Sequence, residues 1–344
     1  MRRALGLFLS IALAAPAASA ARRAAPRAPS VCDTELPLGV LFRFHAGAPT
    51  TPPVRGPEGA FYVGTIDGQV HALHPDGSFH WNFTVKGAVT GRLLVERSGV
   101  VLVPATQHIF ALNPDGTLAW RAPMPVEIQG DLVRDGRGHV HVAGADGRLF
   151  ALGERGTRVT EIAVDAPWSA LPTALPDGSV VAASVSGLVV VSAPSGVRRF
   201  ALELAPRQIL LCPGERSCAV AGNTLRSLTG RPELRLRARS AAAAGAFLAL
   251  LVDDRTLAFY DGARTAARYA VHLPSRASAP PVLDAQGTAY VPLVNGAVVA
   301  VSRSGRVLGC EQIGRGATAV ALDASGLVLA ATSEGNVAVI EPRS

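Results

Sequence analysis

The chain has 344 residues, of which 49% are hydrophobic and 5% are aromatic, and its formal net charge at pH 7 is +7. Five arginines and no acidic residue precede residue 31, so the remaining residues carry a net charge of only +2. A weakly charged body without clusters of basic residues interleaved with aromatic ones argues against nucleic acid as a partner.

The first twenty residues have the pattern of a signal peptide. A charged start over residues 1–3 is followed by an apolar stretch over residues 4–15 and by the small residues Ala18–Ala20. We therefore expect cleavage after Ala20 and a periplasmic or secreted product; the pair of arginines near the start leaves twin-arginine export open. Residues 21–30 are rich in Ala, Arg and Pro and are expected to form a disordered arm. The remaining apolar runs are too short for a transmembrane segment, so none is expected.

A sequence repeat with a period near 40 residues runs along the rest of the chain, and Phe61–Trp81 is its clearest copy. Each copy consists of apolar or β-branched runs of strand length, separated by Gly- and Asp-containing turns, with no room for a helix. Aligning the central turns gives eight copies, at Gly68, His108, Gly147, Gly187, Asn223, Arg255, Gly296 and Gly335. The pattern predicts an all-β fold, an eight-bladed β-propeller with four strands in each blade. Seven blades are the alternative if the weak sixth copy is an insertion.

The two ends of the chain are expected to complete one blade. The last copy stops near Ile340 without an outer strand, and Gly39–Phe44 resembles the outer strand in Gly77–Phe83, with Phe42 in the position of the repeat's tryptophan. An N-terminal strand that joins the last blade would close the ring and leave no unpaired blade. The copies use nearly all of residues 31–344, which we expect to form a single propeller domain.

Four cysteines in an exported protein predict disulfides. Cys212 and Cys218 flank a segment where other copies place the tight turn between their first and second strands, so a disulfide across that hairpin is expected. The alternative is a pair of free, partly buried thiols. Cys310 falls in the outer strand of the seventh copy and Cys32 lies just before the N-terminal strand, so these two could pair and fasten the closure.

The segments Ala72–Trp81 and Ala111–Trp120 resemble the repeat of pyrroloquinoline-quinone-type propellers, in which an Ala-Leu pair, a Gly turn and a Trp recur. The resemblance implies that Trp81 and Trp120 dock between adjacent blades, with Phe42 as their equivalent in the closing blade. A large ring at a fixed position would fill the wedge between two twisted sheets.

This family contains quinone-dependent dehydrogenases and non-enzymatic propellers such as the lipoprotein subunit of the outer-membrane β-barrel assembly machinery. The dehydrogenases carry two adjacent cysteines and a set of calcium ligands, whereas no two cysteines are adjacent here. The resemblance therefore implies the non-enzymatic branch, with no cofactor. Val31 stands where a lipobox needs a small residue before its cysteine, so no lipid anchor at Cys32 is expected.

No catalytic residue and no metal site are predicted. His139 and His141 alternate along one strand and share a face, but no third ligand accompanies them, so ordinary strand residues are the favoured interpretation. Most aspartates stand next to or just before a glycine, as hairpin turns require.

A binding site is expected on the face that carries the second-to-third-strand turns and the longer connections between blades, because irregular loops on a rigid scaffold often bind partners. The candidate residues on this face are Asp67, Gln107, His108, Glu127, Gln129, Asp165 and Trp168. Trp168 is either an exposed anchor or a buried wedge residue, and the buried role is favoured.

Together these features predict an exported, monomeric, non-catalytic propeller that serves as a rigid scaffold for an envelope or secreted protein or peptide. Two alternatives stay open. One is a quinone-binding or other small-ligand enzyme that uses the central funnel. The other is a binder of carbohydrate or of an envelope polymer, with exposed aromatic side chains along a groove.

Overall fold

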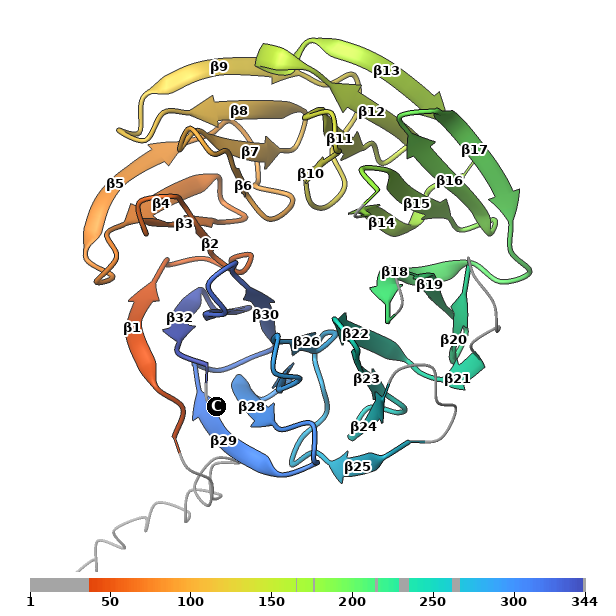
Figure 1. The fold of residues 1–344 in the computed structure, drawn as a ribbon. Helices are drawn as coiled ribbons and strands as arrows, with labels where there is room; N and C mark the ends of the chain where they lie inside the picture. The colour runs from red at the N-terminus through yellow and green to blue at the C-terminus, as the bar shows by residue number, and fades with distance from the viewer. Residues whose placement is uncertain are drawn as a thin grey trace, which may run out of the picture. The chain divides into compact units, whose positions relative to one another are not determined.

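The computed structural model describes residues 37–342, apart from residues 165, 176, 214–215, 229–234 and 262–266 and the side chains of Arg216 and Asp261. In this part of the chain, eight four-stranded antiparallel sheets follow one another around a ring (Figure 1). The described residues contain one short 3-10 turn, Glu154–Gly156. The eight-bladed propeller is thus confirmed, and the sixth copy is a blade rather than an insertion.

The strands of the first four blades follow in chain order from the inside of each sheet to its outside. They are β2 (Val54–Arg55), β3 (Phe61–Gly64), β4 (Gln69–Leu73) and β5 (Phe79–Thr84) in blade 1; β6 (Leu94–Val95), β7 (Val101–Ala105), β8 (His108–Leu112) and β9 (Leu118–Pro123) in blade 2; β10 (Val133–Arg134), β11 (Val140–Ala143), β12 (Arg148–Leu152) and β13 (Arg158–Ala163) in blade 3; and β14 (Trp168–Ala174), β15 (Val180–Ser184), β16 (Leu188–Ala193) and β17 (Gly196–Ala201) in blade 4.

The second half of the ring repeats this order, and its last sheet also contains the first strand of the chain. The strands are β18 (Pro206–Cys212), β19 (Arg216–Ala221), β20 (Thr224–Ser227) and β21 (Arg235–Arg237) in blade 5; β22 (Ser240–Ala244), β23 (Phe247–Leu251), β24 (Thr256–Asp261) and β25 (Tyr269–His272) in blade 6; β26 (Val282–Leu283), β27 (Ala289–Pro292), β28 (Ala297–Val301) and β29 (Val307–Gln312) in blade 7; and β30 (Thr318–Leu322), β31 (Val328–Thr332), β32 (Asn336–Ile340) and β1 (Val40–His45) in blade 8.

Closure of the ring depends on strand β1. It pairs antiparallel with β32 from Val40 opposite Ile340 to His45 opposite Asn336. The guanidinium of Arg43 also donates a hydrogen bond of 3.0 Å to the carbonyl oxygen of Gln312 in blade 7. The expected joining of the chain ends is therefore confirmed.

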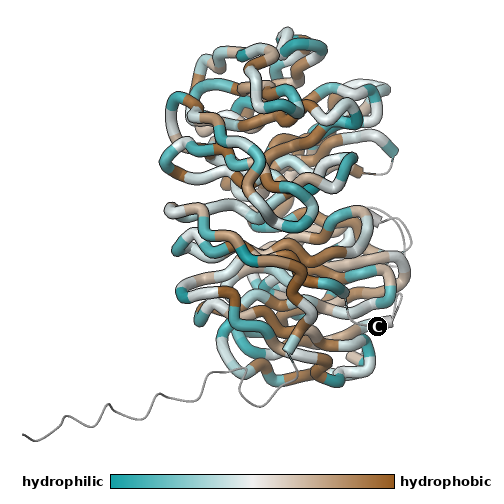
Figure 2. Tube along the Cα trace, turned by 90° about the vertical axis from the view of Figure 1, so that its left-hand side faces the viewer, coloured by the Kyte–Doolittle hydropathy of each residue, from teal (hydrophilic) through white to brown (hydrophobic). Residues whose placement is uncertain are grey.

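The middle strands form the core because the blades pack face to face and bury both sides of each sheet. All five residues of β7 are buried, and so are all five of β28, which explains their uninterrupted apolar sequences. Apolar clusters cross from one blade to the next, as between blades 6 and 7, where Phe259 and Val299 share one cluster. In the edge-on view, hydrophobic residues fill the strands and hydrophilic residues mark many of the turns (Figure 2).

The connections between strands alternate between two faces of the ring. We call the face with the turns between first and second and between third and fourth strands the turn face. The face with the second-to-third-strand turns and the blade-to-blade connections is the connection face. Asp76 in one turn-face hairpin accepts a hydrogen bond of 2.9 Å from the backbone N–H of Ser78, and Gly77 there has a positive φ of 83°. This is why the repeat needs its Asp-Gly pair.

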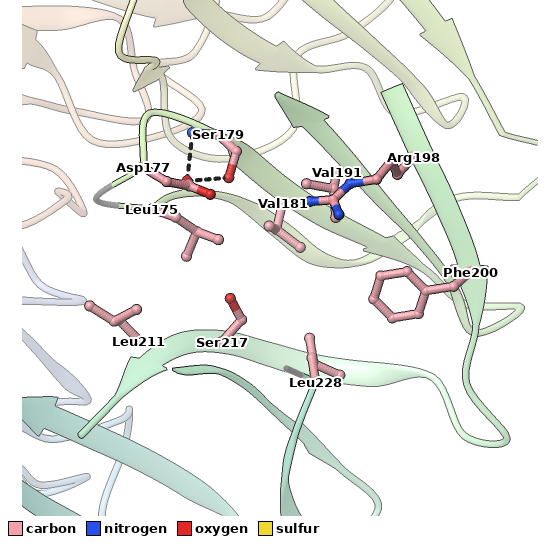
Figure 3. Close-up of a pocket in the computed structure, with 10 residues that line it drawn as sticks. All are labelled: Leu175, Asp177, Ser179, Val181, Val191, Arg198, Phe200, Leu211, Ser217 and Leu228. Carbon is pink, nitrogen blue, oxygen red and sulfur yellow. Dashed lines mark hydrogen bonds between the residues drawn. The ribbon is translucent and has the colours of Figure 1, made fainter. Parts of the chain in front are cut away.

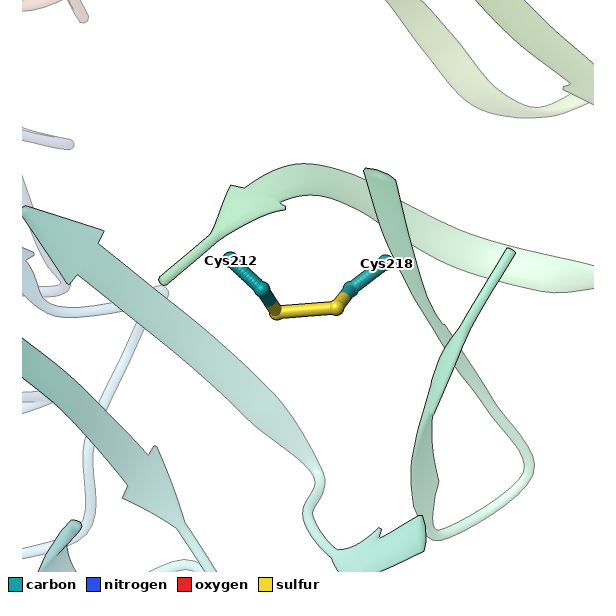
Figure 4. The surroundings of a disulfide bond; sticks show 2 residues. All are labelled: Cys212 and Cys218. Atoms are coloured by element: carbon teal, nitrogen blue, oxygen red, sulfur yellow. A yellow bond between two sulfur atoms is a disulfide. The ribbon is translucent and has the colours of Figure 1, made fainter. Parts of the chain in front are cut away.

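One disulfide staples the first hairpin of blade 5. Cys212 on β18 and Cys218 on β19 are bonded, with their Cα atoms 5.9 Å apart (Figure 4). The expected pair is therefore confirmed. Cys310 on β29 is buried and takes part in a disulfide, while its expected partner Cys32 lies outside the described residues, so that pairing stays a prediction.

Residues 1–36 lie outside the described part of the chain, so the signal peptide and the arm remain predictions. Within the described ranges, no helix has the length and apolar character needed to cross a membrane.

Candidate functional site

The outer strands of blades 8, 1, 2 and 6 each place an aromatic side chain against a glycine of the following blade, and Tyr269 on β25 contacts Gly305 in this way. Trp81 on β5 lies against Gly116 of blade 2, where an added Cβ would come within 2.8 Å of the indole. Its Nε1–H donates a hydrogen bond of 2.8 Å to the carbonyl oxygen of Pro114. Trp120 lies against Gly156 in the same way, and Phe42 of the closing blade lies against Gly77.

Strand register locates the equivalent position in the other blades. Trp81 stands opposite Ala72, four residues after the central-turn glycine of its blade. The same count leads to Thr160 in blade 3, opposite Ala151, and to Arg198 in blade 4, opposite Val191. The aromatic series therefore breaks at blades 3 and 4, and also at blade 7, where Gly309 stands opposite Ala300. Every residue of β17 in blade 4 is exposed.

A crevice lies in the seam between blades 4 and 5, beside this break (Figure 3). It has a volume of about 230 Å³. We call it the blade 4–5 crevice; its lining residues are Leu175, Asp177, Ser179, Val181, Val191 and Arg198, Phe200, Leu211, Ser217 and Leu228. Six of the ten are large apolar residues, and they come from both blades.

Two residues of β17 stand over this crevice. Arg198 and Phe200 are two positions apart, so they project from the same side of the strand, and both extend over the space between the blades (Figure 3). Arg198 is exposed and has no ion pair or hydrogen bond among the interactions of the described residues. The crevice therefore combines six apolar side chains with a guanidinium that has no hydrogen bond or ion pair among the described residues.

The acidic residue of the crevice, Asp177, already accepts hydrogen bonds within its own turn. Asp177 accepts hydrogen bonds from the hydroxyl of Ser179 at 2.5 Å and from its backbone N–H at 2.9 Å. These bonds lower the pKa of Asp177, and the positive charge of Arg198 lowers it further. Asp177 thus stays ionised as a turn former and has no need of Arg198 as a direct partner.

Exposed apolar side chains continue from this crevice onto the connection face. Phe200 and Leu228 also line a smaller cavity of about 140 Å³, together with Leu204. Leu204 is 57% exposed, and Val185 in the central turn of blade 4 is 54% exposed. We call Val185, Phe200 and Leu204 the blade 4 apolar strip.

The candidates predicted from sequence fall into two groups. Asp67, Gln107 and Glu127 are exposed on the connection face of blades 1 to 3, and His108 and Gln129 are half-buried there. Asp165 lies outside the described residues.

Trp168 does not belong to an exposed face. It opens strand β14, is 4% exposed and packs in an apolar cluster with Ile162 and Val190. Its indole is buried because Trp168 is the first residue of the inner strand of blade 4 and not part of the exposed connection before it. Trp168 is therefore removed from the binding-face candidates and has the buried role that was favoured.

The two histidines of blade 3 have a structural role in a turn. Asp135 is buried and accepts backbone N–H bonds of 2.9 Å from Arg137 and His139, while His141 Nε2 donates to its other oxygen at 3.1 Å. Blade 7 has the same arrangement with other residues, since Tyr290 donates to Asp284. The contact between His141 and Asp135 in blade 3 thus has the same place in its turn as the contact between Tyr290 and Asp284 in blade 7.

Burial alone would raise the pKa of Asp135, but the hydrogen bonds from His141 and from the backbone lower it below its usual range. Burial lowers the pKa of His141 despite its bond to Asp135. Among the residues that the structure describes, no three His, Cys, Asp or Glu side chains are grouped to hold a metal ion.

Sequence reasoning missed the blade 4–5 crevice. The available signal was the register of the repeat, which places Arg198 where Trp81 and Trp120 stand. That register becomes visible only when the outer strands are aligned through their partners, because the turns before them differ in length.

Known proteins share the repeat and the fold of this chain. Residues 40–199, less than half of the chain, match the family described as outer membrane protein assembly factor BamB, which confirms the resemblance of the repeat. No curated protein matches the chain.

Solved structures of several proteins have the same architecture. BamB from Moraxella catarrhalis superposes with a TM-score of 0.74 at 16% identity, over 89% of this chain and 100% of that one. Sqt1 from Saccharomyces cerevisiae has a TM-score of 0.74 at 13% identity, over 90% and 100%. The computationally designed Ika8 protein has a TM-score of 0.72 at 14% identity, over 88% and 100%. These identities show a shared fold alone. Residues 40–199 therefore match the repeat family described as outer membrane protein assembly factor BamB, and the closed ring has the fold of the Moraxella catarrhalis protein.

Proposed function

We propose that this chain is an exported, non-catalytic propeller that binds another protein or a peptide in the cell envelope. The observation that carries the proposal is the blade 4 apolar strip, in which Val185 and Leu204 are each more than half exposed, and Phe200 and Leu204 line the smaller cavity. Exposed apolar side chains that gather in one part of a rigid body are typical of protein-binding surfaces. A propeller supplies such a body, because its blades are fixed by the closed ring.

Two further features support this proposal. The signal-peptide pattern of residues 1–20 and the BamB-like repeat both favour the envelope as the place of action. The cysteines are nowhere adjacent, which is unlike the quinone-dependent branch of the repeat family. The binding surface is then on the connection face, as expected from sequence, but at blades 4 and 5 rather than at blades 1 to 3.

Site-specific crosslinking tests the proposal. A photoreactive amino acid is placed at Leu204 in one bait and at Asp67 in another, and each mature protein is irradiated with envelope extract. The proposal expects one protein to crosslink at Leu204 and not at Asp67. That protein is then purified and its affinity is measured directly.

A pair of variants completes the experiment. Val185→Asp with Leu204→Asp should weaken binding of the purified partner at least tenfold, because each change places a charge in an apolar contact. Gln107→Ala with Glu127→Ala, on the same face of blades 1 to 3, should leave the affinity within twofold. Equal crosslinking from both baits, or equal affinities of both variants, would overturn the proposal.

A further inference from the structure

We infer that the blade 4–5 crevice receives one aromatic side chain of an acidic, extended peptide segment, and that Arg198 pairs with a carboxylate beside that side chain. The inference deepens the proposed function and rests on it, because it names the chemistry of the segment that a protein partner would present. It follows from three properties of the seam: its space, its charge and the geometry of β17.

The crevice lies at the position where other seams contain an aromatic docking ring. In the seams that follow blades 8, 1 and 2, the rings of Phe42, Trp81 and Trp120 lie against a turn glycine of the next blade. Arg198 has the corresponding register position in blade 4, and its seam contains a cavity of about 230 Å³ with Val181, Val191 and Leu228 in its lining. A ring from a partner would contact the apolar side chains of Val181, Val191 and Leu228 here, while the turn of blade 5 that corresponds to Gly116 of blade 2 lies outside the described residues.

The charge of this part of the ring is strongly positive. Residues 196–239, which run from β17 to the end of blade 5, contain nine arginines, three glutamates and no aspartate. Their net charge of +6 is the difference of these counts, whereas all residues from 31 onward carry only +2. The rest of the ring taken together therefore carries a net charge of −4, and an acidic partner would be steered to this sector.

Arg198 is the cation placed to contact such a partner at the crevice. It extends over the apolar lining from an exposed outer strand and has no ion pair among the described residues, and Asp177 is held by Ser179. A guanidinium in this position can bind a carboxylate with two parallel hydrogen bonds. A peptide that carries an aromatic residue next to Asp or Glu satisfies both groups at once.

A peptide fits these features better than a nucleic acid does. Binding of single strands relies on successive aromatic platforms for the bases, and the lining of this crevice contains one ring, Phe200. The test keeps an oligonucleotide as a competitor so that the two classes are separated.

The experiment uses the mature protein and fluorescein-labelled twelve-residue peptides. One peptide has a single Trp between acidic residues, the second has Ala in place of Trp, and the third has Lys in place of the acidic residues. We expect the first to bind at least tenfold more tightly than either of the others. Its affinity should fall as salt is raised, as ion pairing requires.

Matched variants locate the binding. Arg198→Trp restores the ring at the docking position, so it should fill the crevice, keep or raise the thermal midpoint and reduce peptide affinity at least tenfold. Thr160→Trp makes the same change at the equivalent position of blade 3 and should leave the affinity within twofold. Arg198→Lys should retain more affinity than Arg198→Trp, because it keeps the charge and leaves the space open.

Three results would overturn the inference: equal binding of the Trp and Ala peptides, unchanged affinity in a folded Arg198→Trp protein, or tighter binding of a single-stranded oligonucleotide than of the acidic peptide. The two proposals can fail separately. If a purified envelope partner binds the wild type and Arg198→Trp equally, the peptide chemistry is wrong and the scaffold function stands. If the acidic peptide binds in the crevice but no envelope protein crosslinks at Leu204, the peptide chemistry stands and the proposed envelope function is wrong.

Discussion

At the scale of single residues, the stacking of one ring on one glycine connects neighbouring blades. Gly116 has a φ of +85° and lies directly under the indole of Trp81. Two requirements therefore meet at one position, a left-handed backbone and the absence of a side chain. The tryptophan of one repeat thus depends on the turn glycine of the next.

Gly116→Ala should separate these two requirements when it is compared with Gly47→Ala. Gly47 has a similar φ of +80°, but an added Cβ there would meet nothing within 4 Å. We expect Gly47→Ala to cost about 1 kcal/mol of unfolding free energy from backbone strain. Gly116→Ala should cost about 1–3 kcal/mol more, because the methyl group displaces Trp81. Urea unfolding measures both, and equal losses would show that the ring contact contributes nothing.

The buried His141 should make stability depend on pH. Burial lowers its pKa in the folded state, so the unfolded chain binds the proton more readily, and stability present above the ordinary histidine pKa is lost as the pH falls. The pKa of His71 is lowered by burial as well and adds to the same decline. Protonation of Asp135 lowers the stability only at a lower pH, because the pKa of Asp135 in the folded state lies below the ordinary carboxyl value.

His141→Tyr is the variant that tests this dependence, since Tyr290 occupies the equivalent position in blade 7. Between pH 7.5 and pH 5, the wild type should lose roughly 1.4 kcal/mol for each unit by which burial lowers the pKa of this group. The variant should lose less, and His80→Tyr at an exposed position should behave as the wild type. Unfolding free energies from urea titrations at both pH values provide the measurement; identical slopes for His141→Tyr and wild type would contradict the assignment.

At the scale of elements, blade 5 differs from the others in how its first hairpin is held. Elsewhere an Asp or a Gly at the turn supplies the hydrogen bonds and the positive φ, as in Asp284–Gly287 of blade 7. In blade 5 the strands β18 and β19 are joined by the Cys212–Cys218 disulfide instead. A covalent link therefore holds this hairpin, whose turn residues 214–215 lie outside the described part of the chain.

Replacing both cysteines by serine should lower the unfolding free energy by about 2 kcal/mol, because the bond closes a short loop with a sequence separation of 6. The loss should be local at first. Hydrogen exchange should become faster in β18 and β19 while the amides of β7 and β8 keep their protection. Uniform acceleration in all blades would mean that the bond stabilises the ring as a whole and not its own hairpin.

At the scale of the whole molecule, stability depends on a closure between residues nearly 300 positions apart. Strand β1 adds the fourth strand of blade 8, and Phe42 packs with Phe61 of blade 1 in an edge-on contact of 5.1 Å between ring centroids. The first strand of the chain thus connects the last blade to the first. Removing its ring should loosen both blades at once.

Phe42→Ala should therefore reduce the unfolding free energy by about 3–5 kcal/mol, the usual loss for truncating a buried phenylalanine. Phe79→Ala is the matched control, because Phe79 stands on an outer strand of blade 1 and is 56% exposed. It should cost less than about 1 kcal/mol. Guanidinium unfolding followed by tryptophan fluorescence compares the two, and a small loss for Phe42→Ala would show that closure does not depend on this ring.

Much of the fold could be predicted from the residues alone. The recurring Gly-Asp turns and strand-length apolar runs indicated eight blades, because period and turn chemistry are local properties. The resemblance of Gly39–Phe44 to Gly77–Phe83 indicated the closure, since both segments had to meet the same packing need. The hairpin disulfide followed from the short spacing of Cys212 and Cys218, which β-pairing could bring together.

The candidate site depended on the tertiary structure. The exposure of Val185 and Leu204, the burial of Trp168 and the open seam under Arg198 are all set by how one sheet packs on the next. Each blade's own sequence specifies its strands and turns, but the space between two blades depends on which side chains both contribute at a shared register. The sequence by itself therefore determined the repeating unit, the blade number and the closing strand. Only the assembled ring decided where a seam stays open, because a gap is a property of two surfaces together.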